Sequence, residues 1–121
     1  MAGGVVANSL NTDFGVFQNN NAYNAIPKAW VNYVGSSGAI SKSFNVSSVT
    51  YNSTGSWTVN FASALSDSNY VTVIGSGTYG TSTAGGISYA PSSQTTSSCG
   101  IGFAVGTSGY NPPNMYVAFF D

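Results

Sequence analysis

The stretch KAWVNYVGSSGAISKSFNVSSVTYNSTGSWTVNF, residues 28–61, decides the fold of this chain. Near its end, Trp57, Val59 and Phe61 alternate with small polar residues, which is the period of a strand with one buried and one wet face. The β-favouring residues 46–51 precede it, and an Asn-Ser-Thr-Gly motif between the two segments supplies turn-forming residues. This pattern predicts a β-hairpin whose second strand faces the core.

The rest of the chain repeats this architecture. Residues 29–34 carry large side chains on both strand faces, so we expect this strand to be covered on both faces, and a Gly-Ser-Ser-Gly motif then turns the chain back. Segments of helical period are absent from the sequence, and polar, glycine-rich turns separate the β-favouring runs. About seven or eight short strands result, which predicts an all-β, single-domain antiparallel β-sandwich, with a jelly roll or a small barrel as alternatives. Further strands are expected over residues 70–74, 87–90, 98–105 and 115–120.

Residues 1–27 differ from the body of the chain. They show no sustained strand or helix period, and Pro27 ends them, so we expect an extended N-terminal arm followed by a β-sandwich domain over residues 28–121. The alternative is a simple edge strand with a frayed terminus. The apolar residues of the arm are predicted to pack against a neighbouring subunit or the surface beneath it. These residues are Val5, Val6, Leu10, Phe14 and Phe17.

The charge content excludes several classes of partner. Only 4% of the residues are charged, against about 25% in an average domain, and the chain has no histidine, glutamate or arginine. Two lysines cannot neutralise a row of phosphates, so we expect no binding to nucleic acid or to an anionic membrane surface, and no apolar run is long enough for membrane insertion. With 42% hydrophobic residues the chain should fold. Its formal net charge of −1 is poor for solubility, which indicates that the protein belongs to an assembly.

Catalytic and metal-binding chemistry is not expected. Acid–base catalysis uses histidine or paired carboxylates, and the three Asp residues lie in predicted turns or at the terminus. Cys99 shares an alternating face with Ile101 and Phe103, which predicts a small buried hydrophobe rather than a nucleophile. We therefore predict no enzyme activity, cofactor or metal site. Asn45 and Asn52 match the glycosylation pattern, but without a secretory signal they are interpreted as an ordinary strand residue and an ordinary turn residue.

Surface aromatic residues leave one binding chemistry open. Tyr79, Tyr89 and Tyr110 lie in or beside loops rich in glycine and serine, where rings beside hydroxyl and amide groups suit neutral sugars. Each of them could equally be a loop anchor whose hydroxyl finds a backbone partner. The three tyrosines are thus candidate glycan contacts.

Two stretches resemble a known family. The run KAWVNYVG, followed by SFNVSSVTYNSTGSWTVNF, resembles the distal β-sandwich domain of tail fibres and tailspikes of short-tailed phages, cyanophages among them. The similarity continues through ASALSDSNYVTV and returns in MYVAFF near the end, and more weakly in residues 4–11. A similar sandwich serves as a capsid decoration, or cement, protein in such phages. Residues 77–94 match nothing in the family.

The resemblance implies a non-enzymatic virion protein and leaves two roles open. In the first, the chain is a homotrimeric decoration protein on the outer capsid surface, with apolar strand faces packed at the three-fold axis. Its arms would grip the major capsid protein, and host surface glycans are a further expected contact. In the second, it is the receptor-binding tip of a tail fibre or tailspike. The absence of a shaft in these 121 residues favours the decoration protein. A lectin unconnected with phage is a weaker third class.

Overall fold

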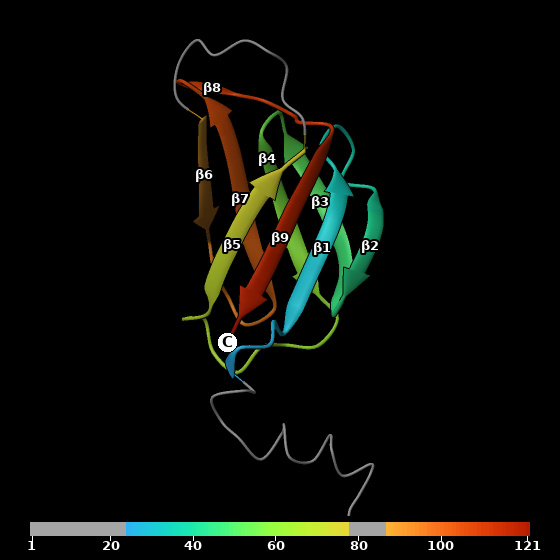
Figure 1. Cartoon of the computed structure of the whole chain (residues 1–121), viewed down its shortest axis with the longest axis vertical. Coiled ribbons are helices and arrows are strands. Elements are labelled where there is room, and N and C mark those ends of the chain that lie inside the picture. Colours follow the sequence, from blue (N-terminus) through green and yellow to red (C-terminus); the bar gives the residue numbers. More distant parts are fainter. Residues whose placement is uncertain (1–23, 78–86) are drawn as a thin grey trace, which may run out of the picture.

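The computed structural model describes residues 24–77 and 87–121 of the chain, and in these ranges it forms two antiparallel sheets packed face to face (Figure 1). The fold class predicted from the sequence, an all-β sandwich, is confirmed, and two separate sheets rule out a single closed barrel. The described strands are β1 (Ala29–Val34), β2 (Ile40–Phe44), β3 (Val46–Ser53), β4 (Ser56–Phe61), β5 (Val71–Ser76), β6 (Ile87–Ser92), β7 (Ser98–Val105), β8 (Ser108–Gly109) and β9 (Asn114–Phe120).

Strands distant in sequence lie side by side in both sheets. Sheet A has the order β2-β1-β9-β5, so its first and last strands are neighbours and Trp30 pairs with Ala118. Sheet B has the order β3-β4-β7-β6, with the two-residue β8 paired to β7. The predicted hairpin is confirmed as β3 and β4, with Val49 opposite Val59. Figure 1 shows sheet A in front of sheet B, and the C-terminus at one end of the sandwich.

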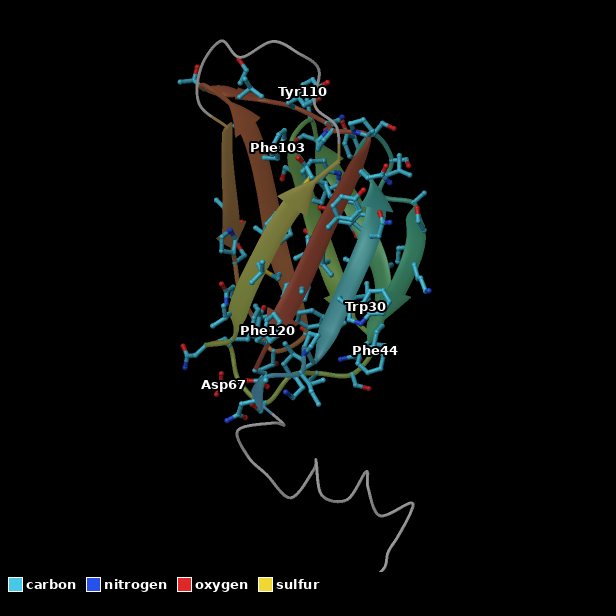
Figure 2. The ribbon with its side chains drawn as sticks, viewed as in Figure 1. Trp30, Phe44, Asp67, Phe103, Tyr110 and Phe120 are labelled. Atoms are coloured by element: carbon cyan, nitrogen blue, oxygen red, sulfur yellow. The ribbon has the colours of Figure 1, made fainter. Side chains whose placement is uncertain are left out.

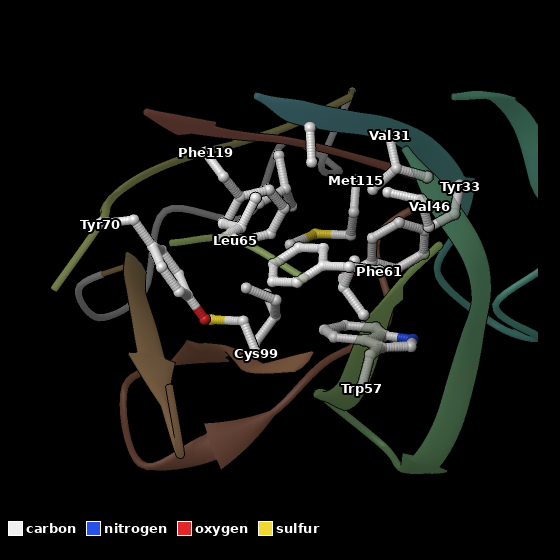
Figure 3. Packing of buried hydrophobic residues seen from close by; sticks show 14 of the residues in the cluster. Val31, Tyr33, Val46, Trp57, Phe61, Leu65, Tyr70, Cys99, Met115 and Phe119 are labelled. Carbon is white, nitrogen blue, oxygen red and sulfur yellow. The ribbon is translucent and has the colours of Figure 1, made fainter. Parts of the chain in front are cut away.

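The core lies between the two sheets and follows the alternation in the sequence. Trp57, Val59 and Phe61 of β4 face it, as predicted, and Cys99, buried with Ile101 on β7, is the small hydrophobe that was expected. Aromatic rings fill its centre edge to face, and Phe61 and Phe119 have ring centroids 4.9 Å apart (Figure 3). Such pairs add to the stabilisation from burial itself.

Two connections join the sheets, one at each end of the sandwich: a hydrogen bond at one end and a one-residue chain link at the other. Trp57 is fully buried, and its Nε1 donates a hydrogen bond of 2.8 Å to the carbonyl oxygen of Gly35, in the turn after β1. A side chain at Gly35 would collide with the Pro112 carbonyl oxygen, so only glycine fits there. At the other end, Asn45 alone joins β2 of sheet A to β3 of sheet B, and it has a left-handed φ of 55°. The prediction that Asn45 lies on a strand is therefore wrong, and so is the prediction that Asn52 lies in a turn, because Asn52 belongs to β3.

The structure corrects three further expectations. Only one face of β1 is buried, because Ala29, Val31 and Tyr33 point into the core while Trp30, Asn32 and Val34 are half-exposed. The prediction that β1 is covered on both faces is wrong for the described part of the chain. Strand β6 continues through Pro91 to Ser92, where a loop was expected, since Pro91 lies on an edge strand and needs no ladder donor there. The described strands also exceed the expected number by the short β8.

Candidate functional site

The described carboxylates serve local structure. Asp67 Oδ1 accepts a hydrogen bond of 2.7 Å from the backbone N–H of Asn69, which is the turn chemistry expected from the sequence. Asp121 Oδ2 accepts hydrogen bonds from the backbone N–H and hydroxyl of Ser66, at 2.7 and 2.6 Å, and these bonds lower the pKa of the Asp121 carboxyl. Within the described ranges, no three metal-ligating side chains of the Asp, Glu, His or Cys types gather. Among the residues that the structure describes, neither carboxylate faces a partner carboxylate that could share acid–base work.

The single thiol lies deep in the core. Cys99 is fully buried beside the ring of Tyr70, whose hydroxyl lies 2.9 Å from the Thr95 carbonyl oxygen and 3.0 Å from that of Ser98 (Figure 3). Burial raises the pKa of the Cys99 thiol and that of the Tyr70 phenol. A buried thiol held in its protonated form is a poor nucleophile.

The structure tests one of the three tyrosines proposed as glycan contacts. Tyr110, in the loop between β8 and β9, is 37% exposed and its ring packs against Phe103 with centroids 6.1 Å apart (Figure 2). This ring contact favours the loop-anchor alternative for Tyr110, whose side chain stays partly exposed. Tyr79 lies outside the described residues. The backbone of Tyr89 pairs with Phe103 in β6 and β7, but its side chain is also outside what the structure describes.

The residues predicted to form a capsid-contact arm also lie outside the described ranges. Val5, Val6, Leu10, Phe14 and Phe17 precede the first described residue, Asn24. The arm and its boundary at residue 27 therefore stay predictions.

The strongest candidate site was missed by the sequence reasoning and lies on the outer face of sheet A. One cross-strand row of this face is apolar throughout, and we call it the apolar row: Phe44 of β2, Trp30 of β1, Ala118 of β9 and Val73 of β5 are aligned by their pairing register. Figure 2 shows Trp30 and Phe44 on this sheet, with Phe120 towards the same end.

The row on one side of the apolar row extends the apolar area, and the row on the other side is mixed and has Lys42 at its β2 end. On one side of the apolar row, Phe120 pairs with Val71, which is 60% exposed. On the other side, Tyr116 pairs with Asn32 and Gly75, and Tyr116 is 44% exposed. Large exposed apolar patches are uncommon on soluble monomers and mark interaction sites. The sequence signal for this surface was that β1 and β9 carry apolar residues on both strand faces and not on one face only.

A shallow groove crosses the outer face of sheet A. It has a volume of about 370 Å³ and runs between Trp30 on one side and Val73 on the other, over the small side chain of Ala118. Asn32 and Tyr116 supply its polar side chains, and the amide of Asn114 donates to Asn32 Oδ1 at 3.3 Å. The groove can therefore hold an apolar group with few hydrogen bonds.

A second cavity lies at the end of the sandwich where the chain enters β1. It has a volume of about 620 Å³, and its walls include Ile26, Pro27 and Leu65. Phe44 borders it as well as belonging to the apolar row, so the cavity and the outer face of sheet A adjoin. Ile26, in its wall, lies two residues after Asn24, the first described residue.

The outer face of sheet B has the opposite chemistry. Its side chains are hydroxyls, amides and small groups that bond to one another: Asn60 Nδ2 lies 3.0 Å from Ser48 Oγ and 3.2 Å from Thr50 Oγ1. Asn52 Nδ2 donates to Thr58 Oγ1 at 2.9 Å in the same way. These bonds pair polar groups of the described part of this face with one another, and a polar surface of this kind is suited to water. The two outer faces of the sandwich are therefore not equivalent.

Comparisons with known proteins add no assignment to this geometry. Family models, curated proteins and solved structures give no match to the chain. In the described ranges, no helix has the length and apolar character that crossing a membrane requires.

Proposed function

We propose that this protein is a non-enzymatic structural component of a bacteriophage virion, a homotrimeric decoration protein on the outer capsid surface. The observation that carries the proposal is the contrast between the two outer faces of the sandwich. Sheet A presents the apolar row, with Phe44 and Val73 each 54% exposed, while sheet B presents a hydrogen-bonded polar face. A module that sits in an assembly needs one face for its neighbours and one for water.

The sequence resemblance supports a phage virion as the proposed assembly. The run KAWVNYVG, residues 28–35, which carries the resemblance most clearly, includes β1, and Trp30 of that strand lies in the apolar row. The proposed partner is the major capsid protein, and host surface glycans are a further proposed contact. Reinforcement follows by mass action, because a ligand that binds only the assembled shell stabilises that shell.

The proposed attachment to the capsid uses the N-terminal arm. The second cavity, beside Ile26 and Pro27, supports this proposal, because it offers an apolar seat at the point where the arm meets the sandwich. Deleting residues 1–20 should abolish binding to capsids while leaving the sandwich folded, since β1 begins only at Ala29. Normal capsid occupancy by the truncated protein would contradict the role of the arm.

The copy number in purified virions tests the proposal. Quantitative mass spectrometry should give a ratio to the major capsid protein near that of the shell subunits. A ratio of a few per cent would overturn the decoration role and favour a receptor-binding tip, in which the loop at Tyr110 would be the place to search for a glycan site. The tip and the decoration protein share the fold, so occupancy separates them where structure does not.

A further inference from the structure

The most exposed apolar side chains of sheet A lie at its two edges. Phe44, on the edge strand β2, is 54% exposed, and Val71 and Val73, on the opposite edge strand β5, are 60% and 54% exposed. Trp30 and Ala118, between the two edges, are half-buried by their own sheet. A partner that buries this apolar surface must therefore contact both edges of the sheet.

Edge strand β5 itself lacks the features that prevent an exposed edge from pairing with another chain. Natural edge strands are commonly protected by charges, prolines or bulges. Strand β2 has Lys42 and an irregular register with β1, and β6 contains Pro91. Strand β5, Val71–Ser76, has no charge and no proline, and it pairs with β9 without a register shift. Among the described edges, β5 is suited to contact with another chain.

We propose that the outer face of sheet A is the contact between copies of this chain, packed around a three-fold axis with Phe44 of one copy against Val73 of the next. The inference rests on the proposed homotrimer and names the surface that forms it. Three sheets that face a common axis form a prism in which the β2 edge of each copy meets the β5 edge of its neighbour. This contact is heterologous and closes into a ring.

The register of sheet A fits this arrangement. Phe44 and Val73 occupy the two ends of the same apolar row, so they lie at the same height along the strands. Rotation about an axis that runs along the strands therefore brings Phe44 of one copy level with Val73 of the next. Trp30 and Ala118, in the middle of the row, then lie nearest to the axis.

The chemistry of the face favours a second copy over a sugar. The apolar row has no hydrogen-bonding group except the indole N–H of Trp30, and the rows beside it carry Val71, 60% exposed, on one side and Tyr116 and Lys42 on the other. Sugar recognition requires polar groups around the ring plane, and the groove supplies such side chains only from Asn32 and Tyr116. A surface of this kind is buried best by another like it.

The size of the face predicts the strength of the trimer. Four strands about 4.8 Å apart and six residues long cover about 400 Å² in plan. A standard interface uses about 800 Å² from each partner, so the face supplies roughly half of that area. We therefore expect a trimer that dissociates on dilution, with the capsid lattice or the arm adding the remaining stability.

Sedimentation velocity and light scattering on the full chain over a dilution series test the proposal. The expected result is a mass three times the 12.4 kDa of the chain at high concentration, falling to the monomer mass on dilution. The variant Val73→Lys should raise the protein concentration at which half of the chains are trimeric by about a hundredfold, because it buries unpaired lysine charges in the contact between copies. Thr50→Lys is the matched control, since Thr50 is also an exposed β-branched residue on an edge strand, but in sheet B.

A charge pair tests the edge-to-edge contact itself. Phe44→Lys and Val73→Glu should each weaken the trimer, and the double variant should recover it, because the new charges meet between copies. Within one copy the two positions lie three strand spacings apart, about 14 Å, which is too far for a salt bridge. Circular dichroism checks that each variant is folded.

Several outcomes would overturn the inference. They are a monomer mass at every concentration, an unchanged trimer in Val73→Lys, equal weakening by Thr50→Lys, or no recovery in the double variant. A monomer whose binding to an oligosaccharide array is lost in Trp30→Ala would show that the face is a glycan site instead. Each of these results is independent of the virion copy number, so the interface can fail while the decoration role stands, and the reverse.

Discussion

The replacement of Asn45 measures how a single residue holds the corner between the two sheets. The Asn45 side chain makes three long-range hydrogen bonds. Its Nδ2 donates to the carbonyl oxygens of Lys28 and Ser63, both at 3.1 Å, and its Oδ1 accepts from the Ser63 N–H at 2.8 Å. Its backbone φ of 55° lies in the left-handed region, which residues other than Gly, Asn and Asp adopt only at a cost in free energy.

Two variants separate the hydrogen bonds from the backbone strain. Asn45→Gly removes the bonds but keeps the left-handed φ accessible, so at about 1 kcal/mol for each bond we expect a loss of about 2–3 kcal/mol of unfolding free energy. Asn45→Ala removes the same bonds and adds about 1 kcal/mol of strain, for a loss of about 3–4 kcal/mol. In a domain of this size, the glycine variant should lower Tm by roughly 8–12 °C.

Asn52→Ala is the matched control for these variants. Asn52 belongs to a second Asn-x-Ser/Thr motif, but it lies at the exposed end of β3 and bonds only to the hydroxyl of Thr58, at 2.9 Å, among the contacts the structure gives. Its loss should stay below about 1 kcal/mol. Urea unfolding followed by tryptophan fluorescence gives all three free energies. Equal losses for the alanine and glycine variants at Asn45 would refute the strain argument, and losses no larger than the control would refute the whole account.

Three further outcomes follow from the core. The hydroxyl of Tyr33 is buried with no partner among the described residues, so Tyr33→Phe should keep or raise stability by up to about 1 kcal/mol, and a clear fall in Tm would contradict this. Burial raises the pKa of Tyr33, Tyr70 and Cys99, so the stability they contribute is present below their unfolded-state pKa and is lost as the pH rises. The urea midpoint should fall between about pH 8 and pH 10.5, and a constant midpoint would argue against it. Gly35→Ala should cost at least about 3 kcal/mol because its Cβ meets a backbone carbonyl, while the control Gly75→Ala, with open space at the same position, should be close to wild type in a thermal melt.

The sequence alone determined which residues belong to strands and which of them point inward. The period of two in β4 and β7 places Trp57, Val59 and Ile101 in the core, and the structure agrees because a strand alternates its side chains whatever its neighbours are. The scarcity of charge was equally plain from composition. These properties are local or additive, so they need no knowledge of the partner strands.

Only the tertiary structure decided which strands pair with each other and which single residues link one sheet to the other. Asn45 looked like a strand residue because its neighbours favour strands, but the crossing from sheet A to sheet B forces it into a left-handed conformation. The covering of both faces of β1 was predicted from its large side chains, yet the described chain buries one face and leaves Trp30 half-exposed.

The apolar row depends on tertiary structure most of all. Phe44, Trp30, Ala118 and Val73 come from four strands, and their alignment exists because β9 inserts between β1 and β5. Each side chain alone is an ordinary surface residue, and the sequence signals no more than apolar residues on a second strand face. Sheet order is set by long-range pairing and by the sum of core contacts, so a surface built across four strands appears only when the chain has folded.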